Sequence, residues 1–329
     1  MTSGPDDATA TFAHHHGIGA AEAAAIRLLF ARALPLEHQD DRFDAWPPPG
    51  ATPEPWTGGR DLVATTATVG DSVVAYVGGT VDADADQNGQ SVAHLDAIVD
   101  ESQPHAAAIL AHCIETASRE LGAIGVSTME LWARPATATH EQVVDRFAMT
   151  PTRALHQMRV PLPVEIAPID SRAYHAHDDL LAVMTVNNRA FATHPDQGSQ
   201  TPERMRATME QRWFQPEGLR IHERDGRVAG FCWTKIHAPR HDLLDPAHTS
   251  PPLGEIFVIG VDPDFHGQGL GAPMTAAGLS WLHEQGLEHG MLYVEADNEP
   301  AVRTYLRLGF VIERTDKAWT HVIAGAEAS

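Results

Sequence analysis

Glycines alternate with other residues in Val261–Ala272, which reads VDPDFHGQGLGA. They stand at Gly267, Gly269 and Gly271, after an apolar run and before a segment with helical periodicity. Because glycine has no Cβ atom, consecutive backbone N–H groups of such a loop can approach an anion closely. A helix that starts here adds the positive end of its dipole, and Pro273 suits its first turn. The spacing therefore predicts a loop that binds phosphate groups.

Two well-known kinds of nucleotide loop fit this stretch poorly. A P-loop of the NTPase type ends in Gly-Lys-Ser/Thr, whereas this loop ends in Gly271-Ala272-Pro273. GQGLGA does match the dinucleotide fingerprint G-x-G-x-x-A. However, residues 262–266 separate its first glycine from the strand, and the loop lies late in the chain. A glycine-rich turn that holds no ligand is the remaining alternative.

The flanking segments carry two further signals. Gly260 interrupts the apolar run FVIGVD, and a glycine inside a strand suggests a bulge that turns backbone groups away from the ladder. The segment DNEPAVRTYLRLGF places Asn298 before a short helix that carries Tyr305, and Gly309 is well placed to end that helix. A bulged strand, a glycine loop and a short tyrosine-bearing helix therefore follow one another in this part of the chain.

The order and spacing of these features over Glu255–Phe310 resemble the GCN5-related N-acetyltransferase (GNAT) family. The pyrophosphate loop of that family reads Gln/Arg-x-x-Gly-x-Gly/Ala. His266 departs from its first position, although a neutral imidazole still donates one hydrogen bond. The resemblance implies acetyl-CoA as the co-substrate, with no metal. The positions that it implies for binding acetyl-CoA are Ile259, Gly260, Val261, His266, Gly267, Gln268, Gly269, Leu270, Gly271, Ala272, Asn298, Glu299, Pro300, Ala301, Val302 and Arg303.

Further motifs resemble one branch of that family, the mycothiol synthases. They are NNRAF, HPDQG, GFCWTKIH, GEIFVIGVDP and MLYVEADNEPAVRTYLRLGF, together with a layout of two tandem domains. The match is dense over residues 160–320 and thin over residues 1–150. The resemblance implies acetylation of the cysteinyl amine of the cysteine–glucosamine–inositol precursor, which is the last step of mycothiol biosynthesis.

The same resemblance implies roles at the reacting centre. Glu255 is expected to be the general base and Tyr305 the general acid beside the sulfur, while the N–H of Val261 would stabilise the oxyanion. Acceptor-binding side chains are expected at Glu37, Asp196, Lys235, Glu255 and Tyr293. The alternatives are an exposed strand-end carboxylate for Glu255, a phenol packed against a helix for Tyr305, and solvated surface groups for the others. Trp233 and Trp281 are expected in the core.

Periodicity predicts the same order of elements in both halves of the chain: a hairpin, a strand ending in Val-Asp, a helix and another strand. This order predicts a duplicated α/β (α+β) domain, and the family resemblance implies that the two are tandem GNAT-like domains. Each is expected to have a mixed, mostly antiparallel sheet flanked by helices. We expect a flexible tail over residues 1–17, a degenerate N-terminal domain over 18–160 and a catalytic domain over 161–329. The predicted helices are Glu22–Leu34, Ala106–Leu121, Glu141–Ala148, Leu180–Ala190, Pro202–Arg212, Ala272–Glu284 and Glu299–Leu308.

The first half lacks the features that would bind acetyl-CoA. After Asp100 it reads ESQPHAAAILA, with no glycine, and Glu101 adds a negative charge where phosphate would lie. Its counterpart of the tyrosine-bearing helix, THEQVVDRFAMT, carries Phe147 and no tyrosine. We therefore expect the first half to be a structural partner that forms one wall of the acceptor cleft.

Composition limits the partners. The 329 residues include 23 Lys and Arg against 44 Asp and Glu, and a net charge of −21 disfavours nucleic acid and anionic membrane. No membrane span or secretory signal is found, so we expect a cytoplasmic, monomeric enzyme with buried thiols at Cys113 and Cys232. The run His14–His16 is expected to be part of a polar tail rather than a metal site.

Two other functions remain open at this level. One is acetylation of a different amine, such as an aminoglycoside or a peptide N-terminus, because the insertion 238–252 lies beside the expected cleft. The other is a non-catalytic protein that binds acyl-CoA, although the presence of Glu255 and Tyr305 argues against it.

Overall fold

The computed structural model describes residues 10–34, 36, 62–81, 91–192 and 197–323, and the described chain forms two compact units. Unit 1 contains the chain up to Ala154, the segment His241–Ser250 and the chain from Thr315 onward. Unit 2 contains Leu155–Arg240 and Pro251–Arg314. In the described ranges, no helix combines the length and the apolar content needed to cross a membrane.

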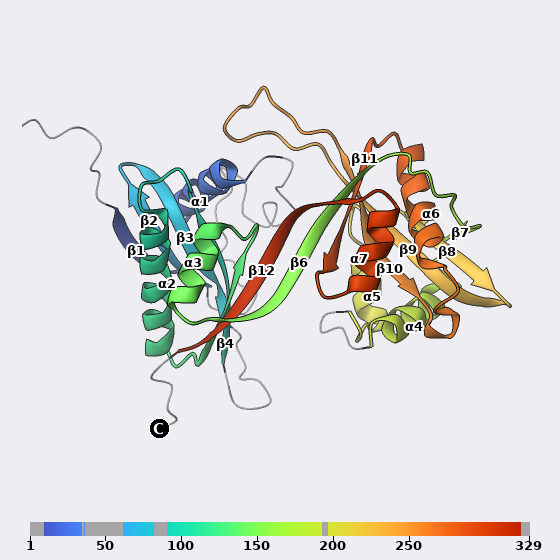
Figure 1. Ribbon diagram of the computed structural model, residues 1–329, viewed down its shortest axis with the longest axis horizontal. Helices are drawn as coiled ribbons and strands as arrows, with labels where there is room; N and C mark the ends of the chain where they lie inside the picture. The colour runs from blue at the N-terminus through green and yellow to red at the C-terminus, as the bar shows by residue number, and fades with distance from the viewer. Residues whose placement is uncertain (1–9, 35, 37–61, 82–90, 193–196, 324–329) are drawn as a thin grey trace, which may run out of the picture. The chain divides into compact units, whose positions relative to one another are not determined.

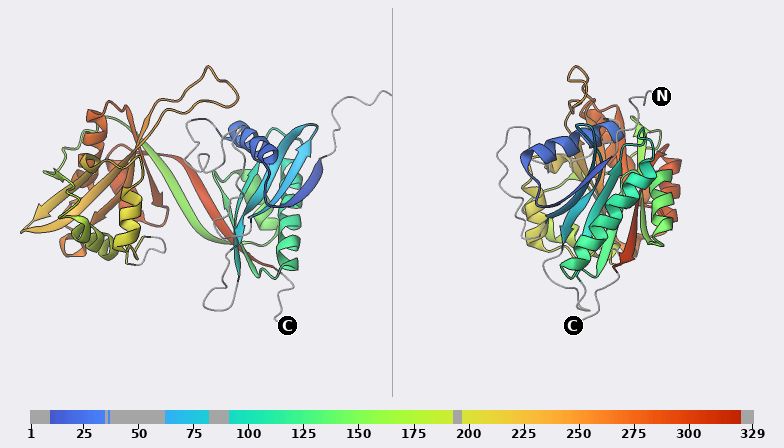
Figure 2. Two further views of the ribbon diagram at one scale, coloured as in Figure 1. Left: turned by 180° about the vertical axis from the view of Figure 1, so that it is seen from behind. Right: turned by 90° about the vertical axis from the view of Figure 1, so that its left-hand side faces the viewer.

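Unit 1 has a sheet between two layers of helices (Figure 2). Strands β4 and β5 are parallel, and the other pairs that join its strands are antiparallel. The helix α1 (Ala20–Ala33) packs on one face, while α2 (Ala106–Ala123) and α3 (Ala138–Arg146) pack on the other. The strands, in spatial order, are β1 (Thr11–His16), β2 (Leu62–Val69), β3 (Ser72–Val81), β4 (Val92–Val99), β5 (Thr128–Ala133) and the end of β12 (Val311–Val322).

The strand β1 corrects part of the expected flexible tail. Residues 11–16 pair antiparallel with β2, and the His14 imidazole lies 3.0 Å from the Thr65 hydroxyl. An edge strand has one side toward solvent and so accepts polar side chains. The histidine-rich composition led to the prediction of a tail, whereas backbone pairing with β2 makes residues 11–16 a strand.

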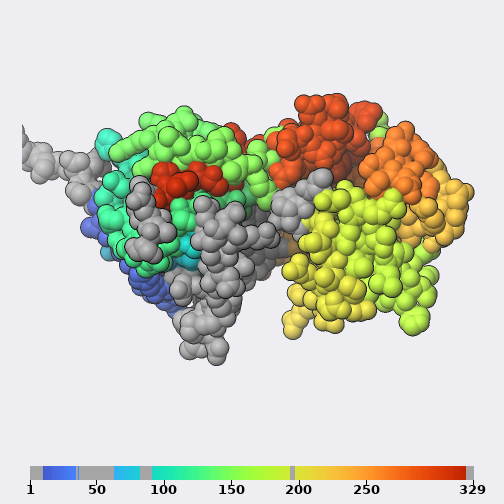
Figure 3. Space-filling model, turned by 90° about the horizontal axis from the view of Figure 1, so that it is seen from below, coloured from blue at the N-terminus to red at the C-terminus, as the bar shows by residue number. Residues whose placement is uncertain are grey.

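Unit 2 repeats the same plan, as expected from the sequence (Figure 1). Strands β10 and β11 are parallel, and the remaining pairs are antiparallel. The helices α6 (Gly271–Glu284) and α7 (Glu299–Arg307) cover one face, and α4 (Leu180–Ala190) and α5 (Pro202–Met209) form the outer layer on the other (Figure 3). The strands, in spatial order, are β6 (Thr150–Pro161), β11 (His289–Glu295), β10 (Leu253–Val261), β9 (Arg227–His237), β8 (Leu219–Arg224) and β7 (Arg172–Ala173).

The last strand of each half joins the other unit. Residues 155–161 of β6 pair with β11 in unit 2, and residues 317–322 of β12 pair with β5 in unit 1. The units therefore differ from the expected division between residues 160 and 161. Residues 155–160 belong to unit 2, and the chain from Thr315 onward belongs to unit 1. Sequence order cannot reveal this, since a terminal strand pairs with whichever sheet edge its linker lets it reach.

Helix α6 lies close to its sheet because residue 278 is a glycine. A Cβ atom at Gly278 would lie 2.4 Å from Cys232 Sγ on β9 and 3.0 Å from Ile256 Cδ1 on β10. Both partners are buried, as is Trp281 on the same helix, which confirms its expected place in the core. This close contact fixes the position of α6 and of the glycine loop that leads into it.

We predict that Gly278→Ala destabilises the protein by about 1–3 kcal/mol, because the added methyl forces α6 away from the sheet. Urea unfolding measures the loss. Adding Cys232→Ala removes the sulfur that is closest to the new methyl and should recover part of it. An unchanged unfolding midpoint for Gly278→Ala would contradict this packing.

Candidate active site

An opening between β10 and β11 is the central feature of unit 2. The two strands pair only over 254–256 and 290–292, although β10 continues to Val261 and β11 to Glu295. On the other side of β10, the Asp262 N–H donates to the Ala229 carbonyl at 2.9 Å. Because hydrogen bonding alternates along an antiparallel pair, Ile259 and Val261 direct their backbone groups away from β9 and into the opening.

The bulge in β10 lies at Phe257, and the predicted bulge at Gly260 is wrong. The register with β9 shifts between Ile256 and Val258, at the point where pairing with β11 ends, whereas Gly260 pairs regularly with Phe231. A Cβ atom at Gly260 would lie 2.8 Å from Phe231 Cε1. Packing against Phe231 therefore explains the glycine at position 260, which the sequence analysis attributed to a bulge.

The glycine loop has the backbone geometry of an anion site. Gly267 and Gly269 both have φ +74°, and an added Cβ would meet nothing within 4 Å at either position. Gly271 is instead the first residue of α6. No described residue accepts a hydrogen bond from the backbone N–H groups of 267–272. These donors and the N-terminus of α6 therefore face a space without a protein acceptor.

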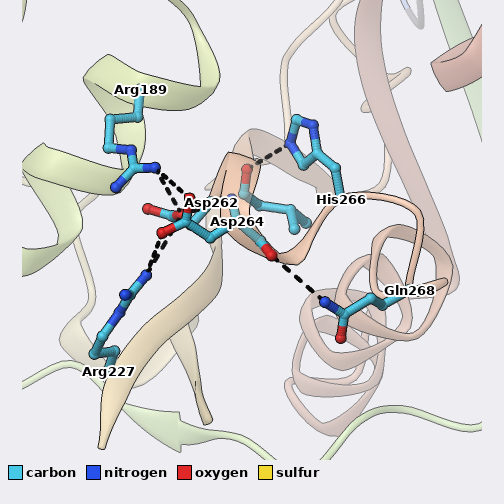
Figure 4. A network of polar contacts seen from close by, with 7 residues as sticks. Arg189, Arg227, Asp262, Asp264, His266 and Gln268 are labelled. Carbon is cyan, nitrogen blue, oxygen red and sulfur yellow. Dashed lines mark hydrogen bonds and ion pairs between the residues drawn. The ribbon is translucent and has the colours of Figure 1, made fainter. Parts of the chain in front are cut away.

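His266 ties this loop to the end of β10. Its Nε2–H donates to the Val261 carbonyl at 2.9 Å (Figure 4). A carbonyl only accepts, so Nε2 carries the proton. The ring nitrogen that was expected to serve a phosphate is thus already engaged by one of the backbone groups at the opening.

Two arginines hold the base of the loop (Figure 4). Asp262, which is buried, accepts the Asp264 N–H at 3.0 Å. Arg189 from α4 and Arg227 from β9 pair with the Asp264 carboxylate at 2.9 and 2.7 Å. Hydrogen bonds from Arg227 and then Arg189 lower the pKa of Asp264. The loop is therefore joined by charge to both a helix and a strand.

Glu255 forms a buried pair with a residue that the sequence analysis missed. His237 Nε2 lies 2.7 Å from Glu255 Oε2, and the two side chains are 13% and 10% exposed. Strand register sets Glu255 between Lys235 of β9 and Met291 of β11 on the α4–α5 face of the sheet. His237 follows Lys235 by two residues, so strand alternation was a usable signal for it.

Lys235 lies among aromatic rings on this face. Its Nζ is 5.1 Å from the Trp213 ring centroid and 5.9 Å from that of Phe257. Trp233, expected in the core, is buried beside both rings. A cation held over aromatic faces keeps its charge while its stem packs against apolar surface. The structure therefore brings Lys235 and Glu255 together as neighbours in one row.

Tyr293 shares this face, and its phenol oxygen accepts two hydrogen bonds. Gln157 Nε2 donates to it at 2.8 Å and Arg314 Nη2 at 3.1 Å. Neither of these donors was singled out from the sequence. The other two expected acceptor-binding residues, Glu37 and Asp196, lie outside the described residues.

Tyr305 lies on the opposite, α6–α7 side of the sheet. Its ring is buried, 5.7 Å from the ring of Phe310. Burial, and secondarily the nearby Cys232 thiol, raises the pKa of Tyr305, so the phenol is protonated at neutral pH. Cys232 pairs with Ile259 across β9 and β10. Tyr305 thus lies beside the opening, with Glu255 on the other face.

The second turn of α7 lies next to the start of α6, because Thr304 Cγ2 is 3.9 Å from where a Cβ of Gly271 would be. Asn298 caps α7 by accepting the Ala301 N–H at 3.3 Å. Glu299 and Arg303 form an exposed ion pair of 2.8 Å. Within the described ranges, no three His, Cys, Asp or Glu side chains are grouped to hold a metal ion.

The Asp264 ion pairs should make stability depend on pH. Because the pKa of Asp264 is lowered in the folded protein, the pairs stabilise it above the unfolded-state pKa, and this is lost as pH falls through the folded-state pKa. Asp264→Asn should lower the melting temperature at pH 7, and the difference should vanish at about pH 3 or below. The matched control is Asp170→Asn at an exposed carboxylate. A difference that persists in acid would contradict the ion-pair assignment.

Known proteins resemble this chain in sequence and in fold. Residues 183–310 match the acetyltransferase (GNAT) family model. A mycothiol acetyltransferase from Acidimicrobium ferrooxidans is 38% identical over 226 residues, covering 67% of this chain and 70% of the relative. The crystal structure of a GCN5-related N-acetyltransferase from Sphaerobacter thermophilus superposes with a TM-score of 0.66 at 17% identity, over 95% of this chain and 96% of that one. A tandem GNAT protein from the clavulanic acid pathway gives 0.57 at 15% identity, over 98% and 100% of the two chains.

The structural likeness confirms the expected tandem GNAT architecture, and the sequence likeness covers most of a curated relative. The chain is therefore an N-acetyltransferase and belongs to the mycothiol acetyltransferase family of GNAT enzymes.

Proposed function

We propose that the protein transfers the acetyl group of acetyl-CoA to the cysteinyl amine of cysteinyl-glucosaminyl-inositol, the last step of mycothiol biosynthesis. The observation that carries this proposal is the buried Glu255–His237 pair beside the opening between β10 and β11. The name of the relatives at 38% identity supports the acceptor. The net charge of −21 disfavours nucleic acid and anionic membrane as partners, and we propose a monomer that works in the cytoplasm.

Acetyl-CoA is proposed to lie in the opening. The backbone groups of Ile259 and Val261 suit the amides of the pantetheine arm, because they lack a strand partner on that side. The N–H groups of 267–272 suit the pyrophosphate. The start of α7 would complete the site, with Asn298 to Arg303 beside it. In this arrangement, backbone N–H donors bind the anion at close range, in spite of the negative net charge of the chain.

The reaction requires two protons to leave the acceptor nitrogen, one from the ammonium before attack and one from the tetrahedral adduct, and one proton to reach the leaving thiolate. Glu255 accepts the proton of the ammonium, and the freed amine then attacks the thioester carbonyl carbon. The Val261 N–H stabilises the oxyanion of the tetrahedral intermediate. When the tetrahedral adduct collapses, the C–S bond breaks and Tyr305 donates its proton to the thiolate. The nitrogen releases its second proton to water, and Tyr305 is reprotonated from water. The raised pKa of Tyr305 keeps that proton in place until it is needed.

His237 and Lys235 would orient the acceptor side. The 2.7 Å contact holds the Glu255 carboxylate against the sheet, so that its second oxygen is left for the amine. Lys235 and Tyr293 are proposed to bind acceptor hydroxyls, and Glu37 and Asp196 are proposed to join them. Removal of any one of these side chains by substitution should weaken acceptor binding more than it slows the chemical step.

Turnover of Glu255→Gln should fall by about 10²–10⁴-fold, because the amide cannot accept the ammonium proton. Acetyl-CoA affinity should stay close to that of wild type. Release of free CoA thiol, followed with cysteinyl-glucosaminyl-inositol, an aminoglycoside and a peptide amine as acceptors, measures both acceptor choice and turnover. Wild-type preference for another amine would redirect the proposal, and turnover of the variant within threefold of wild type would remove Glu255 from the mechanism.

In the described part of unit 1, the parallel strand pair leaves no equivalent opening. Its parallel strands β4 and β5 pair over six consecutive positions, from Val92–Thr128 to Ala97–Ala133, whereas β10 and β11 pair over three. The Glu101 carboxylate also accepts the hydroxyls of Thr137 and Thr139 at the turn where phosphate would have to lie. These contacts support a single acetyl-CoA site in the chain.

Calorimetric titration of the full chain with acetyl-CoA should therefore give one site per chain. Gly269→Val should abolish it, because a branched side chain is strained at φ +74° and would extend into the open space proposed for the pyrophosphate. Gly125→Val, also at a positive φ but in unit 1, is the matched control and should retain binding. Two sites, or a site that survives Gly269→Val, would overturn the assignment.

A further inference from the structure

We propose that Gln157 and Arg159 of β6 form a subsite for the hydroxyl-rich tail of the acceptor, next to Tyr293. The proposal deepens the proposed function and rests on it. The ligand class is a neutral polyol, such as a sugar joined to a cyclitol, attached to the amine that Glu255 deprotonates.

Strand register puts this subsite on the face of the sheet that carries Glu255. Arg159 pairs with Met291, and Met291 pairs with Glu255, so the three side chains form one row across β6, β11 and β10. Gln157 pairs with Tyr293 in the next row on the same face. Neighbouring strands are about 4.8 Å apart, so Arg159 begins roughly 10 Å from Glu255. This separation suits a ring linked to the reacting amine through a short amide.

Gln157 supplies a buried acceptor, its Oε1, to the proposed subsite. The residue is 3% exposed, and its Nε2 donates to the Tyr293 phenol at 2.8 Å and contacts Met291 Sδ at 3.5 Å. Its Oε1 is buried and, among the described residues, has no hydrogen-bond partner. A buried acceptor without a donor is unfavourable, which makes it a good place for a ligand hydroxyl to donate.

Arg159 supplies a matching donor. Its Nη1 lies 3.4 Å from Glu313 Oε1, and the two side chains are 19% and 26% exposed. Its Nε is buried and, within the described part of the chain, finds no acceptor. The two residues therefore offer one unused acceptor and one unused donor, two positions apart on the same strand.

This combination favours a hydroxyl over an anion. A hydroxyl both donates and accepts, so a polyol can satisfy Gln157 Oε1 and Arg159 Nε together. A carboxylate or phosphate only accepts, so it would leave Gln157 Oε1 unsatisfied, and it would be repelled by Glu313. The acceptor tail that fits is therefore neutral and rich in hydroxyl groups.

The test compares two acceptors on the full-length protein: cysteinyl-glucosaminyl-inositol and cysteine amide, which keeps the amine and lacks the rings. Gln157→Met and Arg159→Met retain side-chain length without the polar groups. Each should lower kcat/KM for the polyol acceptor by about tenfold, the value of one to two hydrogen bonds, mainly through KM. With cysteine amide, kcat/KM should stay within twofold of wild type.

Gln285→Met, at an exposed glutamine beyond the end of α6, is the matched control and should change neither substrate. Equal losses with both acceptors, or no loss with the polyol acceptor, would overturn the subsite. A loss confined to a carboxylate-bearing amine would show an anion site instead. If wild type acetylates neither amine, the proposed function fails and not the subsite alone. If Gln157→Met does not fold, the partly exposed Arg159→Met decides the question.

Discussion

The short pairing between β10 and β11 is the constraint on which the rest of unit 2 depends. Two parallel strands that stayed paired would satisfy all their backbone groups and leave no donors for a ligand. Here the pairing with β11 ends at the bulge near Phe257, and β10 continues paired only with β9, with the backbone of Ile259 and the N–H of Val261 facing the opening. The side chains used in the proposed chemistry, Glu255 and Tyr305, lie on opposite faces beside this opening.

A chain with a net charge of −21 must bind an anionic co-substrate through local structure. In the proposed function, the glycine loop does so with backbone N–H groups and the N-terminus of α6, which bear no titratable charge. Its position is fixed by Asp264, which Arg189 and Arg227 neutralise, and by the close approach of α6 at Gly278. Charge at the base of the loop and packing at its end thus act together.

The two units share one order of elements but differ in the length of their parallel strand pair. Both have a hairpin, a strand, a helix and a parallel strand, but the parallel pair is twice as long in unit 1 and its turn is filled by Glu101 and two threonine hydroxyls. Each unit also takes its last strand from the other half of the chain. Strand β6, which begins in unit 1, therefore completes the sheet of unit 2, and the proposed function requires no ligand in unit 1.

The sequence by itself determined the order of elements, the two-fold repetition, the glycine loop and the family, because these depend on local periodicity and on residues close together in the chain. Helix α4 begins and ends where periodicity predicted, and the loop glycines at 267 and 269 do adopt positive φ. Only the tertiary structure decided which strands pair, since β6 and β12 exchange between units. The tertiary structure also placed the bulge at Phe257 and not at Gly260. Position 260 is a glycine because the Phe231 ring leaves no room there for a Cβ atom. Strand alternation could place His237 on the same face as Lys235, but it could not show the contact with Glu255. Gln157 could not be recognised from spacing alone, because its contact with Tyr293 joins residues that are 136 apart in sequence.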